Sequence, residues 1–306
     1  MESIVSFCFA LLAAPLLAAV IMKVKAYVAG KQGPPLFIKY YTLAKLFRKG
    51  SVYSNSTSFV FKLGPVISCC SAIMVLLFFP FAGVAPVFSF HGDVIILFYL
   101  LGLGRFFTIL AALDTASPFE GMGAAREAYF STLAEATIFV VLALFFRLTG
   151  SLSFAGYFTG TAVINLWNPP AGSLLLLVVV AMFMVLLTEN SRVPVDDPAT
   201  HLELTMIHEV MILDHSGPDL ALIELGAYLK LFFYSAFITR LLYPFQLENV
   251  YQNGIIFYGI VCLIYVAVGI TESIMARYRM HLVPKFILTS FALVFFATIL
   301  TMEIVR

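Results

Sequence analysis

Eight long apolar stretches dominate the chain, and short polar segments separate them. Each stretch is continuous and rich in Leu, Phe, Val and Ala, which favours membrane helices over the shorter, alternating strands of a β-barrel. About 20 apolar residues in a helix cross a bilayer. The sequence therefore predicts an all-α, polytopic membrane protein with about eight transmembrane helices, at approximately 4–22, 63–82, 94–113, 128–148, 172–188, 219–242, 254–274 and 285–303.

The composition supports the same class of protein. Of 306 residues, 61% are hydrophobic and 11% are charged, whereas soluble domains have about 45–50% apolar and about 25% charged residues. An ordinary soluble domain and a disordered chain are therefore excluded. The net charge of +1 also excludes a polybasic nucleic-acid binder. Because no linker or long polar segment divides the chain, we expect one integral membrane domain over residues 1–306.

Basic residues predict how the chain is oriented. No acidic residue occurs between Glu2 and Asp93, whereas eight lysines and arginines occur there. By the positive-inside rule, this first loop lies in the cytoplasm. The seventh loop, with Arg277 and Arg279, agrees. We therefore expect a multi-pass protein of the cytoplasmic (inner) membrane, with basic loops in the cytoplasm and both termini outside.

Ionisable residues in membrane helices are costly, so each invites a functional hypothesis. The first group leads into the fourth span and comprises Asp114, Glu120, Arg126, Glu127 and Glu135. Glu135 lies two turns inside that span, where burial favours the protonated form of a carboxyl group, as a proton carrier requires. A purely structural pair with an arginine is the alternative.

The second group follows the fifth span and comprises Glu189, Arg192, Asp196, Asp197, His201, Glu203 and His208. Asp197 is a candidate N-cap with Pro198 at the first helical position, and His201 and His208 then share a helix face. Their spacing differs from that of zinc motifs, so a relay of titratable groups is better supported than a metal site. A solvated loop with helix caps is the alternative.

The third group lies in the sixth span and contains Glu224 and Lys230. They are six residues apart and do not face each other, so each is expected to meet a partner on another span, with Glu135, Glu189 and Arg105 as candidates. A static ion pair is again the alternative. Glu272 is expected to orient the seventh span at the cytoplasmic interface.

The remaining side chains suggest no resident cofactor. The four cysteines form no CxxC motif, and the adjacent Cys69 and Cys70 do not give an iron–sulfur spacing. Tyr157, Phe158, Trp167 and Tyr251 are expected to form aromatic belts at the membrane interface. No cofactor or metal is therefore predicted in this chain.

Several motifs resemble one family in the same order. Glu189–Asp196 resembles the E-T-N-R-x-P-F-D loop, Arg126 and Glu135 have the family's nine-residue offset, and Glu272–Arg279 matches the end of the seventh span. Gly30–Pro35, Tyr40–Leu46 and Asp114–Glu127 resemble the hydrogenase branch. The chain is thus similar to the complex I subunit 1 family, closest to the branch of formate hydrogenlyase and energy-converting nickel–iron (NiFe) hydrogenases.

The resemblance implies a non-catalytic subunit that anchors an electron-transfer arm and couples electron transfer to proton or sodium movement. Its partners would be hydrophilic large and small subunits, an iron–sulfur subunit and antiporter-like membrane subunits, and iron–sulfur clusters and a NiFe centre would belong to those partners. The implied coupling residues are Glu135, Glu189, Arg192, Asp196, Asp197, His201, Glu203, His208, Glu224 and Lys230. The implied loop interface with the redox arm comprises Asp114, Glu120, Arg126 and Glu127.

Three further functions are compatible with the sequence. The first is that of the quinone-chamber subunit of a quinone-reducing NADH dehydrogenase-like complex. Ala199 and His201 stand where that branch has acidic residues, and Thr42 stands where the hydrogenase pattern has an Asp. The departure at Ala199 and His201 favours the hydrogenase branch over quinone binding, whereas Thr42 leaves the first loop's acidic partner open. The second function is that of an independent secondary transporter, and the third is that of a purely structural anchor.

Overall fold

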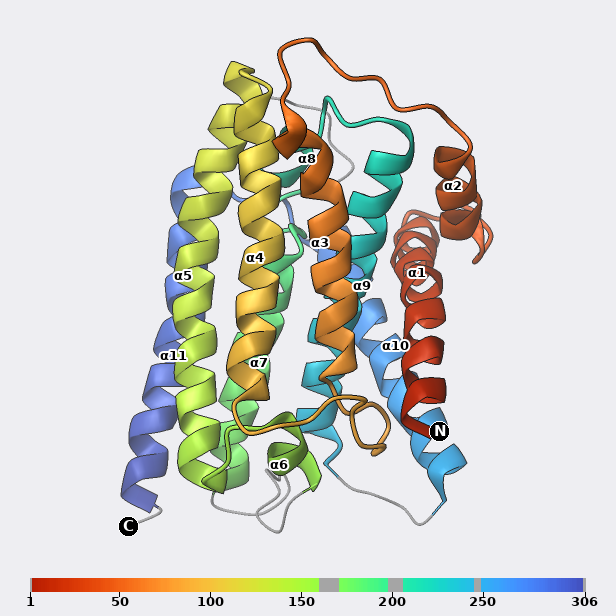
Figure 1. Cartoon of the computed structure of the whole chain (residues 1–306). Coiled ribbons are helices and arrows are strands. Elements are labelled where there is room, and N and C mark those ends of the chain that lie inside the picture. Colours follow the sequence, from red (N-terminus) through yellow and green to blue (C-terminus); the bar gives the residue numbers. More distant parts are fainter. Residues whose placement is uncertain (1, 160–170, 198–205, 245–248, 305–306) are drawn as a thin grey trace.

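The computed structural model describes residues 2–159, 171–197, 206–244 and 249–304, which form an upright bundle of helices (Figure 1). Within these residues, seven helices are long and apolar enough to cross a bilayer: α1 (Glu2–Val28), α3 (Phe59–Leu77), α4 (Asp93–Asp114), α5 (Pro118–Thr149), α9 (Gly217–Leu242), α10 (Val250–Ile274) and α11 (Val283–Ile304). Another apolar helix, α7 (Ala171–Glu189), is shorter. Together they occupy the eight stretches expected from the sequence, so the all-α membrane fold is confirmed.

Four short elements mark the two ends of the bundle. They are α2 (Ile38–Phe47), α6 (Phe154–Thr159), α8 (His208–Met211) and the 3₁₀ turn η1 (Met280–Leu282). Helices α2 and α8 lie toward one end, called here the α8 end, and α6 lies at the opposite or α6 end (Figure 1). Helix α1 begins and α11 ends at the α6 end. This arrangement agrees with an even number of crossings.

The longest helix, α5, has sequence signals at both ends. Ser117 is extended at its N-cap and Pro118 occupies the first helical turn, where the missing proline N–H costs nothing. Gly150 ends the helix with φ = 67°, a left-handed conformation that glycine adopts without strain. These signals allow a helix of 32 residues, which at 1.5 Å per residue is longer than the hydrocarbon layer is thick.

Helices α3 and α4 cross closely because small residues face each other. A Cβ atom on Gly64 would lie 2.7 Å from Ala111 Cβ, and one on Gly104 would lie 2.3 Å from Ser71 Oγ. Side chains at these positions would force the two helices apart. The glycines thereby fix the position of α4, which carries Arg105 next to Gly104.

Helix α9 lies at the centre of the bundle. In its most apolar stretch 72% of residues are buried, against 28–50% in the other candidate spans. At the α6 end its aromatic residues pack against α6, where Tyr157 and Phe158 are fully buried. The expectation that these two aromatics form an interface belt is therefore wrong. Arg240 of α9 holds α6 in place, because its Nη2 donates to the Phe158 carbonyl at 3.1 Å.

Candidate functional site

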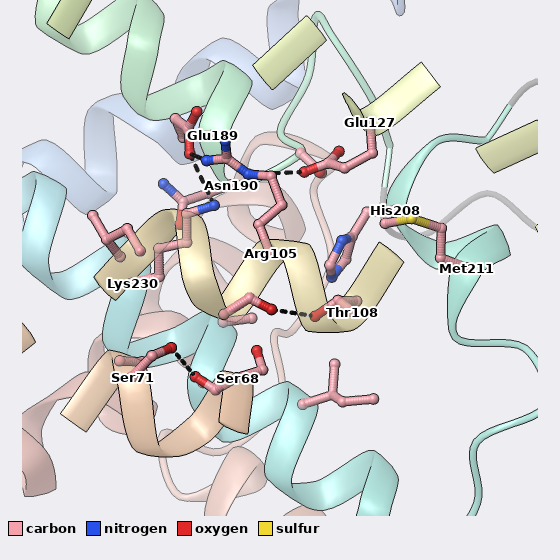
Figure 2. Close-up of a pocket in the computed structure, with 17 residues that line it drawn as sticks. Ser68, Ser71, Arg105, Thr108, Glu127, Glu189, Asn190, His208, Met211 and Lys230 are labelled. Carbon is pink, nitrogen blue, oxygen red and sulfur yellow. Dashed lines mark hydrogen bonds and ion pairs between the residues drawn. The ribbon is translucent and has the colours of Figure 1, made fainter. Parts of the chain in front are cut away.

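An arginine in the middle of α4 is the centre of the site. The Arg105 side chain is 8% exposed and contacts three carboxylates (Figure 2 shows two of them). Its Nη1 lies 2.5 Å from Glu135 Oε1, its Nε lies 3.8 Å from Glu127 Oε1, and its Nη2 pairs with Glu189 Oε2. Because buried charges need partners, Arg105 connects α4 to α5 and α7.

Lys230 of α9 brings a second cation to the same place. Its Nζ lies 2.9 Å from Glu189 Oε2, and the Glu189 side chain is only 1% exposed. The expectation that Lys230 meets a carboxylate on another span is confirmed. Glu224 differs, because it accepts a hydrogen bond of 2.5 Å from Tyr228, which lies one turn later on the same helix. For Glu224, a partner on another span is expected from the sequence, but this hydrogen bond lies within its own helix.

These residues form what is called here the central cluster, which comprises Arg105, Glu127, Glu135, Glu189 and Lys230. Three carboxylates face two cations, so the cluster has one negative charge in excess when every group is ionised. Burial makes such an excess costly. The cluster therefore favours uptake of a proton or of one further cation.

A small chamber, called here the polar chamber because polar side chains stand in its wall, borders the central cluster. Its volume is about 80 Å³, and its wall includes Ser68, Ser71, Thr108, Asn190 and His208 (Figure 2). A buried water needs about 10–15 Å³ of such volume, so the chamber has room for roughly five. Glu189 Oε1 and Asn190 Oδ1 are buried without a hydrogen-bond partner in the described part of the chain. Polar groups in that position bind ordered water.

Glu135 differs from its sequence-based description. The Glu135 side chain is 41% exposed rather than buried. It borders a hollow of about 440 Å³ beside α4 and α5, whose wall includes Tyr99, Phe106 and Phe139. Helix α5 is apolar around most of its circumference, so the sequence pattern does not indicate which face turns inward.

Glu272 belongs to a second, separate ionic group. Its Oε2 lies 3.0 Å from Lys25 Nζ and its Oε1 lies 3.3 Å from Arg192 Nη1. The Glu272 side chain is 1% exposed. Glu272 is thus a buried counter-ion that joins α10 to α1 and to the segment after α7. Its role in orienting the seventh span at the cytoplasmic interface stays a prediction.

Asp196 organises the segment between α7 and α8. Its carboxylate pairs with Arg277 at 2.8 Å and accepts hydrogen bonds from the backbone N–H groups of Ile207 and His208, at 3.0 and 3.1 Å. Asp197 donates its backbone N–H to the same carboxylate at 2.9 Å. The helix proposed to begin at Pro198, with His201 and Glu203, lies outside the described residues. His208 is brought to the chamber.

The group assigned to a loop interface is divided in the structure. Arg126 donates to the Met206 carbonyl at 3.0 Å, Glu120 accepts from the Asp214 N–H at 3.1 Å, and Asp114 accepts from the Ser58 N–H at 2.6 Å. Each braces a different loop. Glu127 instead belongs to the central cluster. Contact of these residues with a redox arm stays a prediction.

His215 and Glu209, which lie outside the spans, have shifted pKa values. Burial lowers the pKa of His215 to about 4, although nearby Asp219 and Asp214 oppose that shift. Burial also raises the pKa of Glu209 above its ordinary value. Both lie at the α8 end, in α8 or in the segment that joins α8 to α9.

Sequence reasoning gave too little weight to two cations. The sequence predicts Arg105 only as a partner for the sixth span, and Lys25 is one of the eight basic residues that precede Asp93. For Arg105 a signal was present, because it is the one charge inside the apolar stretch 94–113 and a charge at such a position needs a partner.

Comparison with known proteins decides the family. The family model described as NADH dehydrogenase matches residues 1–303. The chain belongs to the NADH dehydrogenase family. It is 30% identical to Hydrogenase-4 component C of Escherichia coli (strain K12) over 300 residues, which cover 94% of this chain and 93% of that protein.

Other members of the NADH dehydrogenase family agree. Formate hydrogenlyase subunit 4 of the same organism is 26% identical over 93% of this chain and 92% of its own. The H subunit of NADH-quinone oxidoreductase from Pelagibacter ubique (strain HTCC1062) is 24% identical over 84% and 79%. A chain of the membrane-bound sulfane sulfur reductase (MBS), an archaeal respiratory membrane complex, has the same fold, with a TM-score of 0.83, 18% identity and 97% coverage of both chains. The chain is thus a membrane subunit of the hydrogenase-like and complex I-related class.

In the described residues, no group of three or more His, Cys, Asp or Glu side chains is arranged so that it could hold a metal ion. What the site presents instead is carboxylates, cations and a small polar chamber. That set of groups can exchange protons or bind a monovalent cation.

Proposed function

We propose that this membrane subunit anchors a hydrophilic electron-transfer arm and couples electron transfer to the movement of protons or sodium ions. The observation that carries the proposal is the central cluster, in which three carboxylates share Arg105 beside the polar chamber. The relatives support it, because their names identify them as components or subunits of hydrogenase, hydrogenlyase and quinone oxidoreductase assemblies.

In this proposal the arm docks at the α8 end, which faces the cytoplasm because the basic first loop lies there. The partners are hydrophilic large and small subunits of the hydrogenase type, an iron–sulfur subunit and antiporter-like membrane subunits. Iron–sulfur clusters and a NiFe centre belong to those partners. This chain contributes the ionisable residues that respond to them.

Electrostatics supplies a physical link between the arm and the cluster. At an effective dielectric constant of 20, a unit charge 12 Å away changes the energy of an ionised carboxylate by about 1.4 kcal/mol. That corresponds to roughly a tenfold change in its protonation equilibrium. A redox change that adds or removes charge nearby therefore shifts the occupancy of the cluster by a proton or cation.

The segment after α7 gives a second, mechanical link. Glu189 ends α7 in the central cluster, and Arg192 and Asp196 follow it directly, paired with Glu272 and Arg277. A displacement of this segment by a docked arm changes the position of Glu189 relative to Arg105 and Lys230. The pKa values of the three groups depend on those distances.

The chamber size favours ions over a quinone head group. Sites for small organic ligands have volumes of about 300–1,000 Å³, whereas the polar chamber has about 80 Å³. Its polar wall of hydroxyl, amide and imidazole groups also suits water and small ions. The ion path is therefore preferred to a quinone site in this chamber.

The test is to replace Glu189 by Gln in the assembled complex and to compare it with Glu2→Gln at the opposite end. Inverted membrane vesicles are supplied with the electron donor, and electron transfer is recorded together with the pH gradient and sodium uptake. Glu189→Gln should lower the ratio of ions moved to electrons transferred at least tenfold, while Glu2→Gln should leave it unchanged. An unchanged ratio in an assembled Glu189→Gln complex would contradict the proposal.

A further inference from the structure

A carboxylate near the middle of a membrane helix faces the outside of the bundle. Glu135 lies midway along the 32-residue helix α5, and its side chain is 41% exposed. Since the hydrocarbon core is about 30 Å thick and a helix rises 1.5 Å per residue, a residue midway along a helix of this length lies at the depth of the lipid chains. Glu135 is therefore the outward-facing carboxylate of the central cluster.

A window beside α4 and α5 leads to Glu135. The window is the hollow of about 440 Å³ described above, with Arg105 and Glu135 among the residues that line it. Its aromatic residues Tyr99, Phe106 and Phe139 are 69%, 54% and 50% exposed. Gly102 of α4 lies beside this carboxylate, because a Cβ atom there would be in van der Waals contact with Glu135 Oε1, at 3.9 Å. Helices α4 and α5 lie side by side on the outer face of the bundle (Figure 1).

Lipid chains offer no hydrogen-bond donor or cation to the Glu135 carboxylate at this window. A charged side chain at the centre of a membrane helix is costly unless it is paired. Arg105 offsets only part of that cost for Glu135, because it also serves Glu127 and Glu189. The excess negative charge of the cluster is thus open to the outside at the window, where one additional positive charge would neutralise it.

We propose that the window is the docking site for a transmembrane helix of a partner subunit, which inserts a lysine or arginine side chain to pair with Glu135. The exposed aromatic residues pack against the apolar residues of that helix, and its cation completes the central cluster. The inference rests on the proposed function only in requiring membrane partners, and it does not depend on ion movement.

Photo-cross-linking of the assembled complex in its native membrane tests the contact. A benzophenone amino acid replaces Tyr99, and a matched probe replaces Leu263, which is 65% exposed on α10. The Tyr99 probe should form a covalent product with one transmembrane helix that has a Lys or Arg within one turn of the linked residue. The Leu263 probe, and the Tyr99 probe in the isolated chain in lipid nanodiscs, should not give that product. Products with lipid or quinone alone, or with a helix that lacks a basic residue there, would overturn the proposal.

A charge exchange then tests the ion pair. Glu135→Lys should reduce co-purification of the linked subunit at least tenfold, and the reciprocal Lys→Glu or Arg→Glu change at the mapped position should restore it. The Glu135→Lys chain is first checked for unchanged helix content and a single species in detergent. If that variant is folded and the reciprocal change does not restore co-purification, the proposal is wrong. An uncoupling test that fails at Glu189 while the cross-link forms would reject the proposed function and leave the docking site standing.

Discussion

The two ends of the bundle are held together by different interactions. At the α6 end, Phe79, Phe154, Phe158, Phe233 and Phe237 pack with ring centroids 5.4–6.5 Å apart. At mid-membrane and toward the α8 end, ion pairs and a polar chamber take the place of such a core. The first arrangement has one well-packed state, whereas the second changes its energy whenever a proton or cation is gained.

Helix α9 shows why the two arrangements belong together. Lys230 of the central cluster lies one turn from Tyr234 and only three residues from Phe233, so the ionic cluster rests directly on the aromatic core. A rigid base keeps the charges at fixed distances, which a response to small electrostatic changes requires. The buried charged groups, which are costly to desolvate, are thus concentrated in the central cluster and are largely absent from the aromatic core described at the α6 end.

The largest effect is expected from Arg105→Met. Removing the shared cation leaves three carboxylates facing one lysine, and breaking a buried ion pair from one side costs about 3–5 kcal/mol. The purified subunit should unfold at a markedly lower temperature, and the assembled complex should lose coupling. Arg105→Lys keeps the charge but not the forked geometry, so it should retain part of both. Equal melting temperatures for wild type and Arg105→Met would show that the ion pairs of the central cluster do not stabilise the bundle, and would contradict the contrast drawn with the aromatic α6 end.

A smaller and purely structural effect is expected from Phe237→Ala. The ring is 1% exposed in the aromatic core, and its truncation should destabilise the subunit by about 3 kcal/mol. Phe237→Leu, which keeps most of the volume, should cost less than about 1.5 kcal/mol. In complexes that assemble, the ratio of ions to electrons should stay unchanged for both variants. A loss of coupling in Phe237→Leu would show that the α6 end also takes part in ion movement.

The positions of the long helices could be predicted because a run of about 20 apolar residues has few other stable forms. The pairing of Lys230 with another span could also be predicted, since a cation there needs a partner. The faces of the helices could not, because a helix that is apolar on most sides has no pattern to indicate its interior. For this reason the sequence predicts a buried Glu135, whereas its side chain is partly exposed. For the same reason it does not indicate that three carboxylates share Arg105.

Short segments between spans were the other source of error. Tyr157 and Phe158 follow α5 in a loop-like sequence, and aromatic residues there are typical of an interface. Their burial depends on Arg240, which lies about 80 residues further along the chain and binds α6 from α9. Contacts between residues so distant in sequence are set by the assembled bundle and are not visible in the local pattern.

The smallest effect is a pH dependence at the α8 end. His215 is 4% exposed, stacks on Phe61 with ring centroids 4.0 Å apart, and has a pKa lowered to about 4 by burial. The unfolded chain has an ordinary histidine pKa near 6.5, so it binds more protons than the folded chain between these values. Stability should therefore fall by about 2 kcal/mol as pH falls from 7 to 5.

The comparison of His215→Phe with wild type isolates this contribution. Glu209 acts in the opposite direction, because burial raises its pKa and folding then favours its protonated form. Since Glu209 is present in both proteins, its contribution cancels in the difference of their melting temperatures at each pH. The difference should change in favour of His215→Phe as the pH is lowered from 7 to 5, and the exposed His281→Phe should show no such change. Parallel pH curves for His215→Phe and wild type would mean that the imidazole binds its proton equally well in the folded and the unfolded chain, and would contradict the lowering of its pKa by burial at the α8 end.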